Sequence, residues 1–290
     1  MIAVMGAAGN VGGKVADLLL RRQEQVRVFQ HARRLDELEE RGAEVVAGAA
    51  AEVGDLRPLF DGAEAALVLV PEDVAQPRFV ATRSRITAAV VQALREARMP
   101  HVVALSAVGA DRANAPGPQR GLHELERRLS ELADSNVLVL RSAAYMDYLL
   151  ASLPLIRSQR INGSAVNGDL RFPMIATRDV AWEAAERLAR RDFAGHQVKL
   201  LLGPEDVSLR QATGAIGALL GMAELPYVEL PPADMRRALA GAGMSEEAAS
   251  VMVDMQLALN DGRYFDGVRR TPATATPTRL EEFLKEALDR

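Results

Sequence analysis

The sequence lacks several residue types on which common classes of site depend. None of its 290 residues is cysteine, so disulfide bonds, thiolate catalysis and cysteine-bound metals are excluded. The four histidines (His31, His101, His123 and His196) form no His-x-x-x-His pair, so we expect no metal site. The net charge of −4 argues against a nucleic-acid-binding surface.

Long apolar runs and a basic leader are missing as well. No apolar stretch approaches the roughly 18 residues that a membrane-spanning helix needs. The stretch Ile2–Met5 leads directly into a glycine-rich segment, with no basic leader before it. We therefore expect a cytoplasmic protein that binds neither membranes nor nucleic acid, and the sequence leaves open whether it is a monomer or a homodimer.

Short apolar runs alternate with longer segments of helical spacing. The runs are apolar on both faces, which is typical of buried parallel strands. They span Ile2–Met5, Val26–Phe29, Val45–Ala47, Ala65–Val70, Val102–Leu105, Val137–Leu140 and Val198–Leu202. The helical patterns cover Val11–Arg22, Arg78–Arg98, Leu122–Ala133 and Val180–Arg191. This alternation predicts an α/β fold, a Rossmann-type doubly wound parallel sheet with a smaller, mainly helical C-terminal lobe.

Two stretches interrupt the alternation and suggest the domain boundaries. We expect residues 1–142 and 177–203 to form the Rossmann domain, and residues 143–176 and 204–275 to form a lobe over the C-terminal edge of its sheet. Ligands of open α/β sheets bind at that edge. Residues 276–290 should form a last amphipathic helix.

Serine and threonine mark the expected helix starts in the lobe. Ser208 precedes Gln211 in the spacing of a capping box, and Ser245 can cap the helix that follows it. Thr278-x-x-Glu281 has the same spacing and should open the C-terminal helix.

The stretch "VMGAAGNVGG" (4–13) carries three glycines in the pattern G-x-x-G-x-x-G, between an expected strand and an expected helix. Gly6 permits a tight turn, Gly9 lets a pyrophosphate approach the backbone, and Gly12 lets the helix pack closely on the sheet. The helix N-terminus then presents free N–H groups to the phosphates. A glycine-rich turn without a ligand is the alternative, but the strand–turn–helix context favours dinucleotide binding. The expected contacts are Gly6, Ala8, Gly9, Asn10, Val11 and Gly12.

The tip of the second strand reports on the form of the dinucleotide. An acid here would bind the ribose diol of NAD, whereas a basic group favours the 2′-phosphate of NADP. The sequence "VRVFQHARR" has Gln30 and His31 at the tip, followed by Arg33 and Arg34, with no acid before Asp36. This pattern favours NADP(H), with NAD(H) possible; the alternative is that both arginines are solvated charges at a helix start.

A further expected contact is Val70-Pro71, at the end of the fourth strand. Its backbone would lie beside the nicotinamide half of the cofactor.

Six stretches in order resemble the NmrA-like group of atypical short-chain dehydrogenases/reductases. They are "GAAGNVG", "LVLVP", "HVVALSAVGAD", "VLRSAAYMDYLL", "IATRDVAWEAA" and "PTRLEEFL". The resemblance covers essentially the whole chain and implies a Rossmann domain, a small C-terminal lobe and an NAD(P)(H) site. The group includes NAD(P)H-dependent quinone, ketone, dye and isoflavone-type reductases, and also redox-sensing regulators that bind the dinucleotide without turning it over.

This chain departs from the pattern of that group at three positions. Ala8 stands where the group more often has threonine, and Gln30 where it often has arginine. The third strand is followed by Gly48-Ala49, where Gly-Asp is usual.

Lysine is nearly absent, and this removes the usual catalytic pair of short-chain dehydrogenases. Their Tyr-x-x-x-Lys motif supplies a tyrosine proton donor whose pKa is lowered by the lysine. The only lysines are Lys14, Lys199 and Lys285, and no tyrosine has a lysine four residues later.

Three other residues are candidates for catalysis. Ser106 ends the fifth strand, where the group's catalytic-type serine or threonine lies, although it could be only a turn-forming serine. His123, with Arg127 one helical turn later, occupies roughly the place of the missing dyad and could donate a proton, or could be a solvated side chain. Tyr145 could line the nicotinamide and substrate site, or be a core aromatic. Asp179 in "RDVA" reads as a cap and structural anchor.

Two functions remain open. The first is an NAD(P)H-dependent reductase that transfers hydride to a quinone, ketone or related conjugated aromatic substrate. The second is a non-enzymatic NAD(P)-binding redox sensor that acts through a protein partner, which the missing dyad favours modestly. We favour the reductase, because quinones need little acid catalysis.

Overall fold

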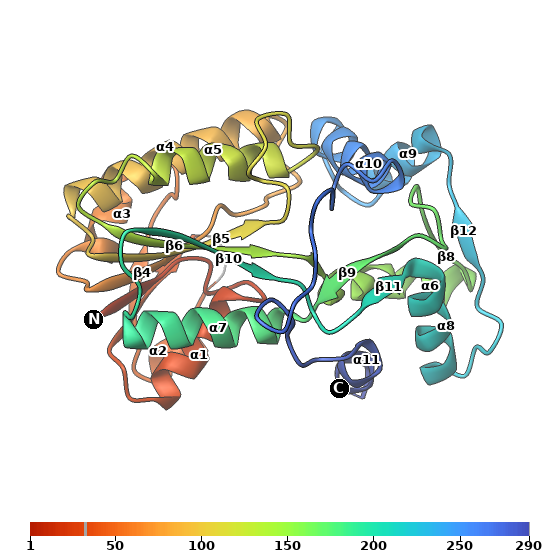
Figure 1. Ribbon diagram of the computed structural model, residues 1–290, viewed down its shortest axis with the longest axis horizontal. Coiled ribbons are helices and arrows are strands. Elements are labelled where there is room, and N and C mark those ends of the chain that lie inside the picture. Colours follow the sequence, from red (N-terminus) through yellow and green to blue (C-terminus); the bar gives the residue numbers. More distant parts are fainter. Residues whose placement is uncertain (32–33, 290) are drawn as a thin grey trace.

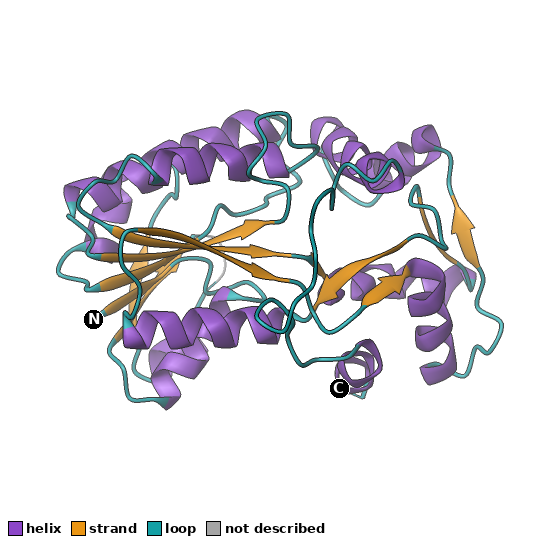
Figure 2. Ribbon diagram, viewed as in Figure 1, coloured by secondary structure: helices purple, strands orange, loops and turns teal. Residues whose placement is uncertain are grey.

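The computed structural model describes residues 1–31 and 34–289. Its centre is a parallel sheet between layers of helices (Figures 1 and 2). The sheet has seven strands in the order β10-β6-β5-β4-β1-β2-β3. The strands are β1 (Ile2–Val4), β2 (Val26–Gln30), β3 (Glu44–Ala47), β4 (Ala65–Val68), β5 (His101–Ala107), β6 (Asn136–Ser142) and β10 (His196–Leu201). All seven expected strands and their parallel pairing are confirmed.

The order of the strands creates the binding edge. β1 pairs with β2 on one side and with β4 on the other, so the chain reverses its direction of winding beside β1. In open α/β sheets, ligands bind outside the carboxyl ends of the strands at such a reversal. The loops after β1 and β4 therefore lie where a ligand is expected.

Helices cover both faces of this sheet, as Figure 1 shows. α1 (Gly12–Arg21) and α7 (Thr177–Arg190) pack against each other on one face. α3 (Val53–Phe60), α4 (Phe79–Glu96) and α5 (Gln119–Leu129) pack side by side on the other. The short α2 (Asp36–Glu40) follows β2. Two apolar clusters fill the space between sheet and helices, because successive strand residues point to opposite faces. The four helices expected from the sequence are confirmed within a few residues at each end.

The C-terminal lobe lies beyond the carboxyl ends of the strands (Figure 1). Its helices are η1 (Met146–Ser152), α6 (Leu153–Gln159), α8 (Leu209–Leu219), α9 (Pro232–Gly241), α10 (Glu246–Asn260) and α11 (Leu280–Leu288). Its short strands are β7 (Ala144–Tyr145), β8 (Asn162–Ser164), β9 (Arg171–Ile175), β11 (Asp206–Ser208) and β12 (Tyr227–Glu229). These strands form two small sheets, β11-β9-β7 and β12-β8, which the helical patterns did not reveal.

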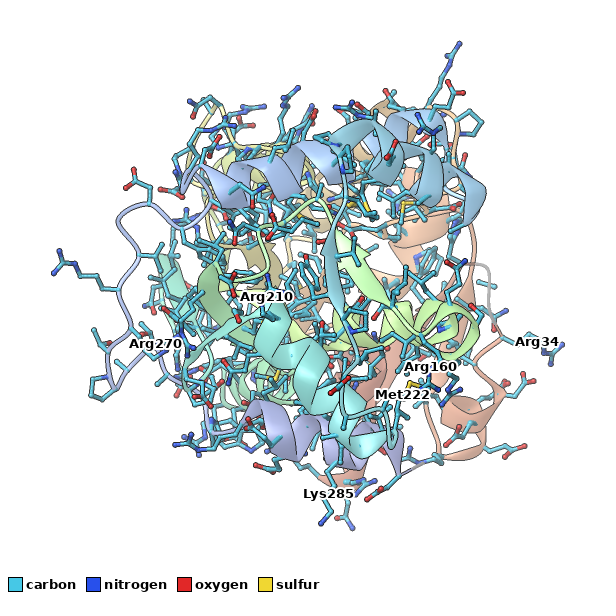
Figure 3. The ribbon with its side chains drawn as sticks, turned by 90° about the vertical axis from the view of Figure 1, so that its right-hand side faces the viewer. Arg34, Arg160, Arg210, Met222, Arg270 and Lys285 are labelled. Atoms are coloured by element: carbon cyan, nitrogen blue, oxygen red, sulfur yellow. The ribbon has the colours of Figure 1, made fainter. Side chains whose placement is uncertain are left out.

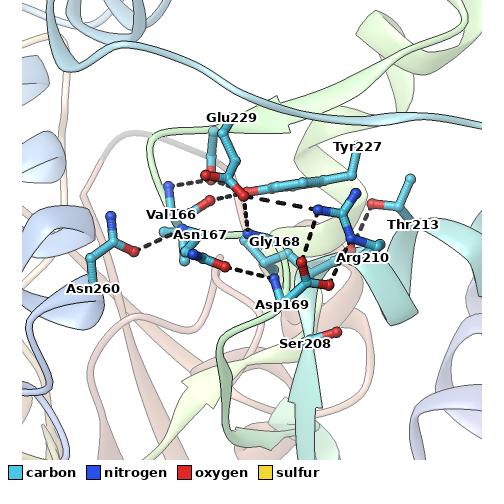
Figure 4. A network of polar contacts seen from close by, with 12 residues as sticks. Val166, Asn167, Gly168, Asp169, Ser208, Arg210, Thr213, Tyr227, Glu229 and Asn260 are labelled. Atoms are coloured by element: carbon cyan, nitrogen blue, oxygen red, sulfur yellow. Dashed lines mark hydrogen bonds and ion pairs between the residues drawn. The ribbon is translucent and has the colours of Figure 1, made fainter.

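A polar network holds the strands and loops of the lobe together (Figure 4). The hydroxyl of Tyr227 donates a hydrogen bond to the carbonyl of Val166 (2.8 Å), and the carboxylate of Glu229 accepts one from the amide of Gly168 (3.0 Å). Arg210 pairs with Asp169 at 2.7 Å. We assign this network a structural role, since every contact in it joins two parts of the lobe.

The helix caps of the lobe were predicted correctly at two positions and wrongly at a third. The hydroxyls of Ser208 and Ser245 accept hydrogen bonds from the amides three residues later, each at 3.1 Å. Thr278 does not cap the C-terminal helix, whose N-cap is Arg279 with no side-chain cap bond. The hydroxyl of Thr278 donates instead to the buried carboxylate of Asp179 (2.6 Å), which a local spacing rule could not foresee.

Across the described ranges, we find no helix with both the length and the apolar character that crossing a membrane requires.

Candidate functional site

The glycine loop between β1 and α1 requires glycine for measurable reasons. Gly6 has a φ of +67°, which side chains rarely adopt, and a Cβ there would lie 2.5 Å from the side chain of Leu69. The amide of Gly9 donates to the carbonyl of Gly6 (2.8 Å), which closes the turn. A Cβ on Gly12 would lie 2.3 Å from that same carbonyl oxygen, so the helix can begin against the loop only without a side chain.

The start of α1 is open to an anion. Val11 is the N-cap and makes no side-chain cap bond, and the first turn carries no acid. Among the described residues, the amides of Asn10, Val11 and Gly12 donate to no backbone carbonyl. Ala8, Gly9 and Asn10 are exposed, so a ligand can reach the loop. The loop therefore fits the pyrophosphate of a dinucleotide, which takes up unpaired N–H groups and the positive end of a helix.

The residues expected at the ribose end are partly engaged within the protein. The side-chain oxygen of Gln30 accepts a hydrogen bond from the amide of Leu35 (3.0 Å), and a ring nitrogen of His31 lies 3.3 Å from the carbonyl of Gly48. Arg34 is exposed at the rim of the molecule (Figure 3) and is paired with Asp36 at 2.9 Å. Arg33 lies outside the described residues. A 2′-phosphate contact by either arginine stays a prediction.

Ser106 is buried at the end of β5 and its hydrogen is already in use. Its hydroxyl donates to the carboxylate of Glu126 on α5, which also accepts hydrogen bonds from Nε and Nη2 of Arg141 at the end of β6. The three side chains tie β5, β6 and α5 together. In this arrangement Ser106 has no hydrogen left to offer a substrate carbonyl, and its role as a catalytic donor stays untested.

His123 is half-buried on α5 and is fixed by the backbone. Its Nδ1 lies 2.8 Å from the carbonyl of Ala110, so that nitrogen carries the hydrogen, and Nε2 has no hydrogen-bond partner among the described residues. Arg127, one helical turn later, is exposed and pairs with Glu131 at 2.6 Å, and the catalytic role of His123 stays a prediction. The helix turns the two side chains toward different partners.

Tyr145 lies in β7, directly beyond the carboxyl end of β6. The pKa of its phenol is raised to about 12, mainly by desolvation and also by the carboxylates of Glu72 and Asp147, while a hydrogen bond with Ser142 lowers it. A phenol with this pKa keeps its proton at neutral pH. Tyr145 is therefore a hydrogen-bond donor and a flat contact surface, and a weaker acid than free tyrosine.

Glu72 is a residue of this region that sequence reasoning missed. It follows the expected Val70-Pro71 contact at the end of β4 and pairs with Arg83 of α4 at 2.9 Å. The hydroxyl of Tyr148 lies 3.5 Å from its other carboxylate oxygen. Burial raises the pKa of Tyr264, and the charge of Glu72 adds to this shift, as it does for Tyr145 and Tyr148.

Two buried polar side chains at the same end of the molecule lack a partner atom. Gln119 at the start of α5 donates through Nε2 to the hydroxyl of Tyr264, but its Oε1 has no hydrogen-bond partner among the described residues. The Nη2 of Arg83 is likewise buried without a partner there. No sequence motif predicts the roles of these residues, because their partners are distant in the sequence. Gln119 and Tyr264, for example, are 145 positions apart.

Lys14 links the glycine loop to the residues around Tyr145. Its ammonium group donates to the carbonyl of Asn10 (2.9 Å) and to the hydroxyl of Thr177 (3.0 Å), and lies 3.9 Å from Asp147. Asp147 also accepts hydrogen bonds from the amide and hydroxyl of Thr177. The start of η1 is therefore held beside the loop.

A separate cavity of about 240 Å³ lies in the lobe, with Phe172, Phe265, Arg171 and Arg270 among its lining residues. Its lining includes no residue of the glycine loop, so we do not assign the dinucleotide to it.

Comparison with known proteins agrees with this geometry. The chain is 26% identical over 274 residues to quinone oxidoreductase 2 of Escherichia coli, across 92% of this chain and 90% of the relative. The structure is similar to that of the NADPH-dependent quinone oxidoreductase of E. coli in complex with NADPH, with a TM-score of 0.82 and 22% identity over 99% of this chain and all of the other. It is also similar to the triphenylmethane reductase of Citrobacter sp. in complex with NADP(H), with a TM-score of 0.79 and 20% identity over 99% of this chain and all of the other.

The family model for NAD(P)H-binding proteins matches residues 6–188, which is more than half of the chain and begins at the first glycine of the loop. The dinucleotide expected from the sequence is thereby confirmed at the level of NAD(P)H. The chain belongs to the NAD(P)H-binding family.

Proposed function

We propose that this protein is an NADPH-dependent reductase that transfers hydride to a quinone-like or related conjugated aromatic acceptor. The observation that carries the proposal is the glycine loop, with three unpaired amides at the start of α1, beside Tyr145 and Glu72 at the carboxyl ends of the strands. The similarity to quinone and triphenylmethane reductases that bind NADPH supports the acceptor class and the cofactor.

The parts of the chain divide the work. Residues 1–142 and 177–203 would hold the cofactor, with the loop amides on the pyrophosphate and the backbone of Val70 and Pro71 beside the nicotinamide. Residues 143–176 and 204–275 would cover the acceptor, and α11 would close the lobe. When bound, the cofactor supplies the hydride. We expect a cytoplasmic monomer or homodimer, which sedimentation of the pure protein would distinguish.

The proton for the reduced acceptor need not come from tyrosine. One hydride and one proton convert a quinone to a hydroquinone. Hydride transfer makes the quinone oxygen basic, and the oxygen can then take its proton from water. His123 is the side chain proposed to relay it, through Nε2. The high pKa of Tyr145 fits a donor that orients the acceptor without giving up its proton.

A non-enzymatic redox sensor is the alternative function. The observation that favours it is the engagement of Ser106 by Glu126, together with the missing Tyr-x-x-x-Lys motif, which leaves this site without the usual acid. Such a protein would bind the dinucleotide and change its affinity for a partner.

One experiment separates the two. Oxidation of NADPH is followed at 340 nm with a panel of benzoquinones, naphthoquinones and polycyclic ketones, while NADPH binding is measured by nicotinamide fluorescence. A reductase turns over at least one acceptor. Micromolar NADPH binding with no turnover on the whole panel would leave the sensor as the function.

A further inference from the structure

The ion pair between Glu72 and Arg83 has one buried partner and one partly exposed partner. The side chain of Arg83 is 5% exposed, whereas that of Glu72 is 34% exposed. The guanidinium carbon lies 5.3 Å from the centre of the Phe79 ring, and a Cβ on Gly121 of α5 would lie 3.3 Å from its Nε. Helices α4 and α5 therefore enclose the positive end of the pair, and the negative end faces outward.

An aromatic surface stands next to this carboxylate. Tyr148 is 61% exposed and its ring stacks on that of Tyr145, with the ring centres 5.8 Å apart and the planes inclined by 26°. Its hydroxyl lies 3.5 Å from Glu72. A flat exposed ring beside a carboxylate attracts positive charge, through the negative face of the ring and through Coulomb attraction.

This surface lies beside the loop that fits the cofactor. Between Tyr145 and Tyr148 the chain carries Asp147, which is tied to Lys14 of α1. The ammonium group of Lys14 lies at the loop and donates a hydrogen bond to the carbonyl of Asn10. Asp147 is nearly buried and engaged by Thr177. Of the two carboxylates beside these tyrosines, Glu72 is therefore more accessible to solvent than Asp147.

We propose that Glu72 selects the acceptor by charge, so that the site reduces flat quinone-type acceptors with positive or neutral substituents in preference to negatively charged ones. This inference rests on the proposed reductase function and names the acceptor class of that same site. Tyr148 is the surface on which such an acceptor stacks, and Arg83 is a positioning residue that holds the carboxylate directed outward.

The expected size of the selection follows from Coulomb's law. Two unit charges a few ångströms apart near a protein surface interact strongly enough to change binding on the order of tenfold, and Arg83 offsets part of this. Because Glu72 is partly exposed, salt should weaken the effect.

The test uses three naphthoquinones that differ only in one substituent: a sulfonate, hydrogen or a trimethylammonium group. At low ionic strength we expect kcat/KM for the cationic quinone to exceed that for the anionic quinone by about tenfold. In Glu72→Gln the ratio of kcat/KM for the cationic quinone to that for the anionic quinone should fall to within about threefold. Asp73→Asn is the matched control, because this exposed neighbour hydrogen-bonds to Gln76 and should leave the ratio unchanged.

Two further measurements keep the inference testable if Glu72→Gln folds poorly. In the unmodified protein, raising the salt concentration should bring the anionic and cationic rates together. Naphthalenes with the same substituents cannot accept hydride, and their affinities, measured by calorimetry with the cofactor bound, should follow the same order.

The failure of this inference can be told apart from the failure of the proposed function. Turnover of all three quinones at equal kcat/KM, independent of salt, would overturn the role of Glu72. So would a ratio that persists in Glu72→Gln or falls equally in Asp73→Asn. Absence of turnover with every quinone, despite NADPH binding, would overturn the reductase function instead.

Discussion

At the scale of single residues, Gly12 carries the sharpest structural constraint on cofactor binding. Its substitution by alanine places a Cβ 2.3 Å from the carbonyl oxygen of Gly6 and 2.8 Å from that of Met5, so the loop must move away from α1. We expect Gly12→Ala to weaken NADPH binding on the order of tenfold or more, because the unpaired amides then no longer converge on one phosphate site. Titration of nicotinamide fluorescence measures the effect.

Gly54 offers the matched control for this substitution. It lies in α3, and a Cβ there would meet no atom within 4 Å. Gly54→Ala should leave NADPH binding unchanged and raise the free energy of unfolding slightly, since alanine is the better helix former. Equal NADPH affinity in Gly12→Ala and the unmodified protein would contradict the role given to the loop.

The arginines after β2 are predicted to select the form of the cofactor. If Arg33 and Arg34 bind the 2′-phosphate, the double substitution Arg33→Ala/Arg34→Ala should weaken NADPH on the order of tenfold and leave NADH almost unchanged, because only NADPH carries that charge. Arg85→Ala removes an exposed arginine on α4 and serves as the control. Parallel fluorescence titrations with both nucleotides measure the difference. If NADPH affinity were unchanged, the assignment would be wrong, and the pairing of Arg34 with Asp36 would explain why.

At the scale of elements, the ion pair of Glu183 and Lys199 joins α7 to the edge strand β10 at 2.7 Å. Burial alone would raise the pKa of Glu183, but hydrogen bonds from Lys199 and Arg187 hold it below its ordinary value of 4.5. A carboxyl with a lowered folded pKa stabilises the protein above about pH 4.5, and this contribution is lost as the pH falls through the folded value.

Lys199→Met should therefore lower the free energy of unfolding by about 1 kcal/mol at pH 7. The deficit should narrow as the pH falls below 4.5, because Glu183 then becomes protonated in both proteins. Urea unfolding at several pH values measures it. Lys285→Met, at an exposed position on α11, makes the same exchange and should have little effect at any pH. If the difference in the free energy of unfolding did not change with pH, the lost stability would come from packing and not from the ion pair.

The elements themselves were largely predictable, and the site was predictable only in part. Buried strands such as Ala65–Val68 and the strand–turn–helix signal around Gly6 are local patterns, and each local choice agrees with the fold. The partners of Glu126 and Glu72 depend on which strands and helices lie side by side. Those contacts follow from tertiary packing, which no spacing in one sequence reveals. Thr278 failed as a cap for the same reason, because a distant carboxylate competes for its hydroxyl.

At the scale of the whole molecule, three consecutive residues at the start of α7 join separate parts of the fold. Thr177 donates to Asp147 beside the cofactor loop. Arg178 pairs with Glu282 and Glu286 on α11. The buried carboxylate of Asp179 accepts hydrogen bonds from the amide (3.0 Å) and the hydroxyl (2.6 Å) of Thr278. The C-terminal helix, which packs with Leu280, Phe283 and Leu284 in the core of the lobe, is thereby fixed to the Rossmann domain.

Asp179 should consequently affect how firmly the C-terminal segment is attached, and should affect cofactor binding much less. Asp179→Ala leaves two buried donors of Thr278 unpaired, so we expect a loss of about 2–3 kcal/mol in the free energy of unfolding. Thr278→Val removes only the hydroxyl and keeps the amide bond, so its loss should be smaller, about 1 kcal/mol. Limited proteolysis should release the segment after residue 270 faster in Asp179→Ala than in Thr278→Val, while both variants still bind NADPH. If both variants lost NADPH binding at temperatures where they stay folded, the contact between Asp179 and Thr278 would support the cofactor site. It would then not serve only to attach the C-terminal segment to the Rossmann domain.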